Sequence, residues 1–249
     1  MRKRESMGAA LVCGAVLAAC GSGSASPTGS RSSAISTQPK GTTSSAPVAA
    51  LSKARATAIG IAINLTLADL PAFAASPADN SGDMATAARL AACAGTTPPN
   101  QEVASTESSH FTMHQNTPQD LEASSSVDVL ASAAAVAHDF AIVTGPKYVS
   151  CGRSVLDNTF HKEGVTANFK ELASRKIELA GADEAFTTGL DATVTGKGIT
   201  LHLVSQTIDF AIGPAEIGVE VDTMGLPVPQ TLLTSLTAKL VQRARAQLG

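Results

Sequence analysis

Apolar and polar residues alternate through much of the last third of the chain, and this period of two predicts β-strands. Residues 186–194 and 217–221 each place Phe, Leu, Ile, Val or Ala at every second position or nearly so. Residues 199–203 alternate in the same way, but the apolar set shifts at 208–212, which predicts a β-bulge near Ser205 or a strand break. Gly196-Lys197-Gly198 and Gly213-Pro214 predict the turns, and residues 175–180 predict a further strand. We therefore expect a β-meander.

Helical spacing of apolar residues appears in four other regions. Ser132 is a good N-cap for a helix over 133–143, which Gly145-Pro146 ends before the next helix begins. That second helix has a buried stripe of Tyr148, Cys151, Val155, Leu156 and Phe160. Another helix runs from Asp79, Asn80 or Ser81 through Cys93, and a last one follows Pro229.

The remaining segments are less regular. The apolar run 58–65 fits a buried strand or a short helix equally well, while 102–113 and 125–130 predict two moderately polar strands. Strands with one apolar face and helices with one apolar stripe fit together as an α+β domain. We predict a single domain over residues 50–249, with a twisted antiparallel sheet, helices packed on one face and one interhelical disulfide.

The first twenty residues have the three parts of a secretory signal peptide. Arg2, Lys3 and Arg4 precede an apolar run over residues 7–17, which is too short to span a membrane, and small residues lead to Cys20. Leu17-Ala18-Ala19-Cys20 resembles the lipobox of bacterial lipoproteins. This resemblance implies that residues 1–19 are removed and that Cys20 carries fatty acyl chains, beginning with a diacylglycerol. We therefore expect a protein anchored by lipid on the extracytoplasmic face of the cell membrane.

Composition after Cys20 predicts a tether and then a globular domain. Residues 21–49 are rich in Ser, Thr, Gly, Pro and Ala, so 20–49 is interpreted as a lipidated Cys followed by a flexible tether. Loss of residues 1–19 leaves 15 basic and 20 acidic residues, a net charge of −5. This balance argues against nucleic acid and against polybasic attachment to lipid. The absence of Trp and the single Tyr weaken the case for a sugar or nucleobase stacking site.

Two cysteines remain after Cys13 and Cys20 are assigned to the signal peptide and the anchor. Cys93 and Cys151 would lie in a compartment that permits oxidation, so we predict a disulfide between them. Cys151 points inward in its helix, towards the helix that carries Cys93. The alternatives are two separate thiols and a redox pair, but only Arg153 stands near enough in sequence to acidify a thiol.

The polar side of the meander is the candidate ligand or partner surface. Its residues are Thr187, Asp191, Thr193, Thr200, His202, Glu216, Glu220 and Asp222. If the sheet curls, these side chains form a concave patch of hydroxyls and carboxylates with one imidazole. Such a patch could receive a ligand, a cation or a partner protein, and a solvated sheet face is the alternative.

No motif predicts catalysis, a metal or a cofactor. His110 and His114 are four residues apart, but the surrounding Ser and Thr indicate a strand or loop, and no ligand set completes a site. His138-Asp139 is expected on a solvated helix face, and no Gly-x-Ser-x-Gly elbow accompanies it. We expect a protein that is not an enzyme.

The order of the motifs resembles a group of actinobacterial, chiefly mycobacterial, exported lipoproteins related to the extracytoplasmic sensor domain of receptor Ser/Thr kinases. The motifs after the lipobox and tether are Ile63-Asn64-Leu65 with Asp69-Leu70-Pro71, Leu90-Ala91-Ala92-Cys93-Ala94-Gly95, the helix from Ser132, Cys151, and the C-terminal meander and helix. The resemblance implies an antiparallel sheet with disulfide-tied helices and a cleft for a ligand. It supplies no active-site residues, and it differs here in allowing one disulfide instead of two.

These observations favour a non-catalytic, membrane-anchored binding or sensor module. Its ligand would be a small or amphipathic molecule of the cell envelope. The alternative is a structural or interaction protein that docks on another envelope component through the open sheet face. A pocket between sheet and helices favours the first hypothesis, and a flat apolar patch favours the second.

Overall fold

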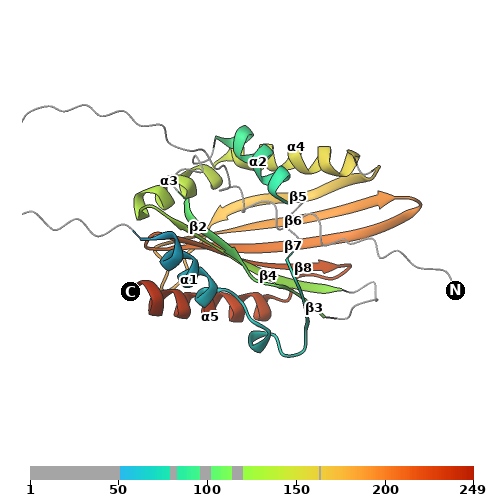
Figure 1. Cartoon of the computed structure of the whole chain (residues 1–249). Helices are drawn as coiled ribbons and strands as arrows, with labels where there is room; N and C mark the ends of the chain where they lie inside the picture. Colours follow the sequence, from blue (N-terminus) through green and yellow to red (C-terminus); the bar gives the residue numbers. More distant parts are fainter. Residues whose placement is uncertain (1–50, 79–82, 96–101, 114–119, 163) are drawn as a thin grey trace, which may run out of the picture.

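The computed structural model describes residues 51–78, 83–95, 102–113, 120–162 and 164–249, and its strands form one antiparallel sheet (Figure 1). The strands are β1 (Ala74–Ser76), β2 (Glu102–Glu107), β3 (His110–Met113), β4 (Leu121–Leu130), β5 (Thr166–Lys176), β6 (Glu184–Gly196), β7 (Ile199–Ile212) and β8 (Ala215–Met224). Their order across the sheet is β1-β3-β4-β8-β7-β6-β5, and β2 also pairs with β4. The α+β class and the antiparallel sheet are confirmed.

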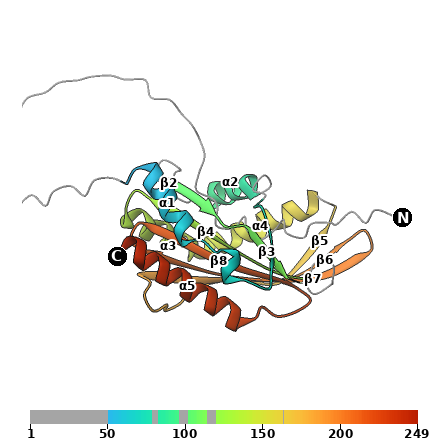
Figure 2. The same cartoon turned by 60° about the horizontal axis from the view of Figure 1, so that its bottom comes forward.

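Helices cover both faces of this sheet. They are α1 (Lys53–Ile63), α2 (Asp83–Ala94), α3 (Ala133–Val143), α4 (Pro146–Lys162) and α5 (Gln230–Leu248), with a short 3-10 turn η3 (Leu67–Asp69). Helices α1 and α5 lie side by side on one face, whereas α2, α3 and α4 lie on the other (Figures 1 and 2). The expectation that the helices share one face is therefore wrong.

Successive residues of β7 show why both faces are covered. Phe210 belongs to the apolar core under α1 and α5, while Ala211 belongs to the core under α2, α3 and α4. Because successive side chains of a strand point to opposite faces, the sheet separates two cores. In the second core the rings of Phe140 and Phe186 meet edge to face, with centroids 5.1 Å apart.

The apolar set of β7 shifts near Ser205 although the strand stays continuous. Strand β7 pairs with β6 and β8 without a change of register, so the predicted bulge or break is wrong. Leu203 faces the α4 side, and further along Ile208 and Phe210 pack into the core under α5. Ile199 and Leu201, before the shift, are exposed, whereas Phe210 and Ile212, after it, are buried in the core under α1 and α5, so only the second apolar set marks a core face.

Local signals in the sequence explain the helix boundaries. Ser132 caps α3 by accepting a hydrogen bond from the N–H of Ala135 at 3.2 Å, as predicted. Residues 58–63 of the ambiguous run 58–65 form the end of α1, whose N-cap Ser52 accepts from the N–H of Arg55, and residues 64–65 lie beyond the helix. The predicted capping residues 79–81 lie outside the described residues.

Two strand predictions need correction. Residues 102–113 form β2 and β3 in succession along β4, instead of one strand. Strand β5 begins at Thr166 and ends at Lys176, whereas a strand over 175–180 was expected. A register shift between Phe169 and Glu171 interrupts its alternation, which hides the strand in the sequence.

Candidate functional site

The predicted polar residues do not share one face of the sheet. Thr187 pairs with Ile208, and Thr193 pairs with His202, so these residues and Asp191 lie on the face that carries α1 and α5. Glu216 and Glu220, with Asp222, lie on the opposite face, because the residues between them, Ile217, Val219 and Val221, pack under α5. The prediction of a single polar face is therefore wrong. Its residues divide between the side of an open groove and a buried acidic seam on the opposite face.

The groove lies over β5, β6 and β7, beside the N-terminal end of α5. Its volume is about 480 Å³, within the range of small-molecule sites in proteins. Its lining combines the polar or charged residues Glu171, Arg175, Thr187, Asp191, Gln206 and Gln230 with Ala173, Gly189, Val204, Pro227 and Val228; it also includes Leu190 and Ser205, whose side chains point to the opposite face. The groove can therefore contact both the polar and the apolar parts of an amphipathic molecule.

Asp191 is held between two basic side chains at one end of the groove. Its carboxylate accepts a hydrogen bond from Nε2 of His202 at 2.7 Å and another from Nζ of Lys170 at 3.3 Å. The hydrogen bond from His202, with the Lys170 ammonium, holds the pKa of Asp191 below its ordinary value. The Asp191 carboxylate is therefore ionised at neutral pH and orients the imidazole of His202.

Side-chain amides order the other end of the groove. Nε2 of Gln230, the first residue of α5, donates to Oε1 of Gln206 at 2.6 Å. Nε2 of Gln206 lies 3.4 Å from Oγ1 of Thr187, which in turn donates to the carbonyl of Thr207 at 2.9 Å. This chain of hydrogen bonds joins the start of α5 to the floor of the groove.

The acidic seam comprises Asp128 on β4, Asp139 on α3, Asp209 on β7, and Glu216 and Glu220 on β8. Asp128 and Glu216 are cross-strand partners, and Asp209 pairs with Gly218 between the two glutamates. Asp128, Asp139, Asp209 and Glu220 are each at most 8% exposed. The seam thus gathers carboxyl groups from three neighbouring strands and from the helix that covers them.

Sequence reasoning found only Glu216 and Glu220 of this seam, and it placed them on a solvated or ligand-facing side. Asp139 was expected on a solvated helix face together with His138; His138 is exposed, but Asp139 is buried. Polar residues alternating with apolar ones normally mark a solvent face. Nothing in the pattern indicates that α3 covers these acids.

Burial determines the protonation of the seam. It raises the pKa of Asp128 to about 7 against a hydrogen bond with Ser105 that lowers it, and it raises the pKa of Glu216 to about 9; nearby carboxylates add to the rise in both cases. Burial also raises the pKa values of Asp209 and Glu220 well above their ordinary values. At its rim, Glu102 has a pKa of about 7 through burial and Asp128, with Lys53 acting in the other direction.

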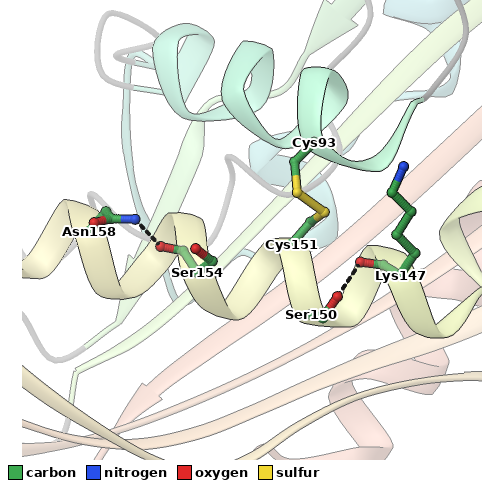
Figure 3. The surroundings of a disulfide bond; sticks show 6 residues. All are labelled: Cys93, Lys147, Ser150, Cys151, Ser154 and Asn158. Carbon is green, nitrogen blue, oxygen red and sulfur yellow. Dashed lines mark hydrogen bonds between the residues drawn. A yellow bond between two sulfur atoms is a disulfide. The ribbon is translucent and has the colours of Figure 1, made fainter.

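The predicted disulfide is present. Cys93 on α2 and Cys151 on α4 are bonded, with their Cα atoms 5.8 Å apart, and the bond ties the two helices together (Figure 3). Cys151 is buried in the second core, and hydrogen bonds such as that from Ser150 Oγ to the Lys147 carbonyl lie along α4 beside it. The bond is part of the layer that covers the acidic seam.

The other histidines form no catalytic or metal grouping in the part of the chain that the structure describes. His110 pairs with Glu122 across β3 and β4, whereas His114 lies outside the described residues. Among described residues, no three or more His, Cys, Asp and Glu side chains are arranged to hold a metal ion. The helices found in those residues also include none with the length and apolar character needed to cross a bilayer.

Fold and site together define a disulfide-bonded α+β domain with a groove on one sheet face and a buried acidic seam on the other. Searches of protein families and of curated proteins found no match to the sequence. Among solved structures, the chain is similar to the extracellular domain of PknH from Mycobacterium tuberculosis, with a TM-score of 0.37 and 12% identity. The match covers 79% of this chain and 98% of that domain.

Proposed function

We propose that this protein is a non-catalytic binding module that captures a small amphipathic molecule of the cell envelope in the groove over β5, β6 and β7. The groove itself is the observation that supports this function. Its volume of about 480 Å³ suits a small ligand, and Val204, Pro227 and Val228 supply apolar contacts. Arg175 and the Asp191–His202 pair supply charged groups on the polar side.

We also propose the anchor as part of this function. Fatty acyl chains on Cys20 would hold the domain at the membrane, because each buried CH₂ contributes about 0.8 kcal/mol and two or more chains give a stable attachment. A tether over residues 20–49 would let the groove reach molecules at some distance from the lipid surface. The domain would then either store its ligand or report it to a partner.

Native mass spectrometry, with lipid extraction, tests the capture function on the mature protein purified from its own envelope. The proposal predicts a bound species that is displaced on denaturation. A matched pair of variants locates it. A Cβ added at Gly189 meets nothing within 4 Å, so Gly189→Leu places a side chain in the groove without a clash.

The control is Thr195→Leu, which places the same leucine side chain at an exposed position of the same strand beyond the groove. Gly189→Leu should lose the bound species while Thr195→Leu keeps it. Clean apo protein from several preparations would instead support the docking alternative. Equal occupancy in both variants would exclude the groove as the binding site.

A further inference from the structure

The acidic seam has no use in the proposed capture of a ligand, and it is costly to bury. The charged groups that act on Asp128, Asp209, Glu216 and Glu220 are other carboxylates, while hydrogen bonds with Ser105 and Ser205 partly offset the burial of Asp128 and Glu220. Like charges this deeply buried destabilise a fold unless something neutralises them. The folded protein must therefore hold positive charge in the seam, as protons or as a bound cation.

Two observations favour protons. One is the geometry stated above: the described acids are not arranged around a common point where a metal ion would fit. The other is Asp209, which is 4% exposed and whose Oδ2 has no hydrogen-bond partner. The charge of Asp128 raises the pKa of Asp209, and the charge of Asp209 raises the pKa values of Glu216 and Glu220. A buried carboxyl oxygen that has no hydrogen-bond donor and lies in the field of other carboxyl groups is a natural place for a proton.

Among the described residues, the titratable groups around the seam are mostly acids, and the two bases act on its outer members. The surrounding titratable groups are Glu102 and Glu107 on β2, Glu122 on β4, Asp222 on β8, Tyr148 on α4, Lys53 on α1 and His110 on β3. Lys53 acts on Glu102 and His110 pairs with Glu122. Ser205 donates to Glu220 at 3.0 Å, which satisfies one acceptor of the seam.

From this arrangement we propose that the seam is a proton-dependent contact, in which protonated carboxyl groups let α3 pack on the sheet and their ionisation releases it. Helix α3 is the element that responds, because its 11 residues bring Asp139 directly over the acids of β4 and β8. Neighbouring α2 and α4 are held to each other by the disulfide. The proposal is independent of the groove and of any ligand.

The sign of the pH dependence follows from the raised pKa values. Unfolded Asp and Glu titrate near pH 4, whereas in the fold Asp128 and Glu216 titrate at about 7 and about 9. The stabilisation is fully present below about pH 4 and is lost as the pH rises through 7 towards 9. If the closed state holds about two more protons than the state in which α3 is released, the opening constant of α3 rises about 100-fold per pH unit.

Hydrogen exchange of the α3 amides in the full mature protein tests the proposal. After correction for intrinsic exchange, protection of α3 should fall by roughly 10- to 100-fold per unit between pH 6 and 8, while α5 keeps its protection. Equilibrium unfolding of the wild-type protein over the same range gives a second measurement that needs no variant. Unchanged α3 protection across this range would overturn the proposal.

Variants and added cations separate protons from other causes. Asp209→Asn with Glu216→Gln mimics the protonated seam. The fold decrease in α3 protection per pH unit should therefore be smaller than in the wild-type protein, by a factor of about 10 or more. The control, Asp157→Asn with Glu178→Gln, neutralises two exposed acids and should retain the wild-type slope. The same slope in both double variants would overturn the assignment to the seam. Restoration of α3 protection by Ca²⁺ or Mg²⁺ at high pH would also overturn it, in favour of a metal occupant.

Discussion

Replacing Arg243 with Met should destabilise the fold by about 2–3 kcal/mol, because Arg243 joins α5 to the first helix and its following turn. Its guanidinium donates to both carboxylate oxygens of Asp69, at 2.7 and 2.9 Å. It also donates to the carbonyl of Asn64 at 2.9 Å, just beyond the C-terminal end of α1. Met retains most of the apolar stem and removes only the charge and the donors.

The magnitude follows from the burial of the pair. The Asp69 side chain is only 6% exposed, and breaking a buried ion pair typically costs about 3–5 kcal/mol because the remaining charge is uncompensated. Arg243 is 30% exposed, and Asp69 keeps the N–H and hydroxyl of Thr66 and Lys239 Nζ at 3.6 Å. These remaining partners reduce the expected loss to about 2–3 kcal/mol.

Urea unfolding of wild type and variant at neutral pH measures this difference. Arg245→Met is the matched control, since the Arg245–Asp183 pair is about half exposed on both sides and should contribute less than about 1 kcal/mol. A loss at Arg243→Met no larger than that of the control would refute the reasoning.

The pH dependence gives an independent check. Burial alone would raise the pKa of Asp69, but the hydrogen bonds from Thr66 and Arg243 outweigh it and leave this pKa below its ordinary value. The difference between wild type and Arg243→Met should therefore hold above about pH 4 and shrink as the pH falls through the lowered pKa.

Three further predictions use other parts of the fold. Cys93→Ser with Cys151→Ser should lower the unfolding free energy by about 4 kcal/mol in denaturant, since the bond spans 58 positions; a loss below about 1 kcal/mol would contradict the loop-entropy argument. Gly60→Ala should destabilise the fold by about 1–3 kcal/mol despite the better helix propensity of Ala, because a Cβ there overlaps Oγ1 of Thr106 on β2. The control is Ile61→Ala at an exposed neighbouring position, and a Gly60→Ala variant more stable than wild type would show that β2 moves to accept the methyl group. Cys20→Ser should move the protein from the detergent-extracted membrane fraction to the aqueous fraction, as followed by fractionation and N-terminal peptide mass; membrane retention by the variant would exclude the acyl anchor.

Elements with local signals were predictable from the sequence. Ser132 caps α3 because its hydroxyl and the following alanines suit a helix start, and the stripe from Tyr148 to Phe160 is buried in α4. The disulfide followed from a count of cysteines in an expected export context. The helices could be predicted from residues close together in the sequence, and the disulfide from the oxidising compartment that an exported protein enters.

Features that depend on assembly were not predictable. Alternation assigns residues to two faces of a strand, but it does not say which face a distant helix covers. The sequence therefore predicts a bulge near Ser205 or a strand break, and a single polar surface, and the structure contains none of these. Burial of Asp139 and Asp209 requires α3 to pack over β7 and β8, a contact between segments about 70 residues apart. The groove likewise forms only when α5 is placed beside β7.

Photo-crosslinking in the native envelope tests the binding function most directly. A benzophenone side chain at Val204 would lie in the groove, whereas one at Leu201, three residues earlier and 38% exposed, would lie on the opposite face of the same strand. The groove account predicts that one defined small molecule is attached at Val204 and is absent at Leu201. A crosslinked protein at Leu201 with no small molecule at Val204 would contradict it.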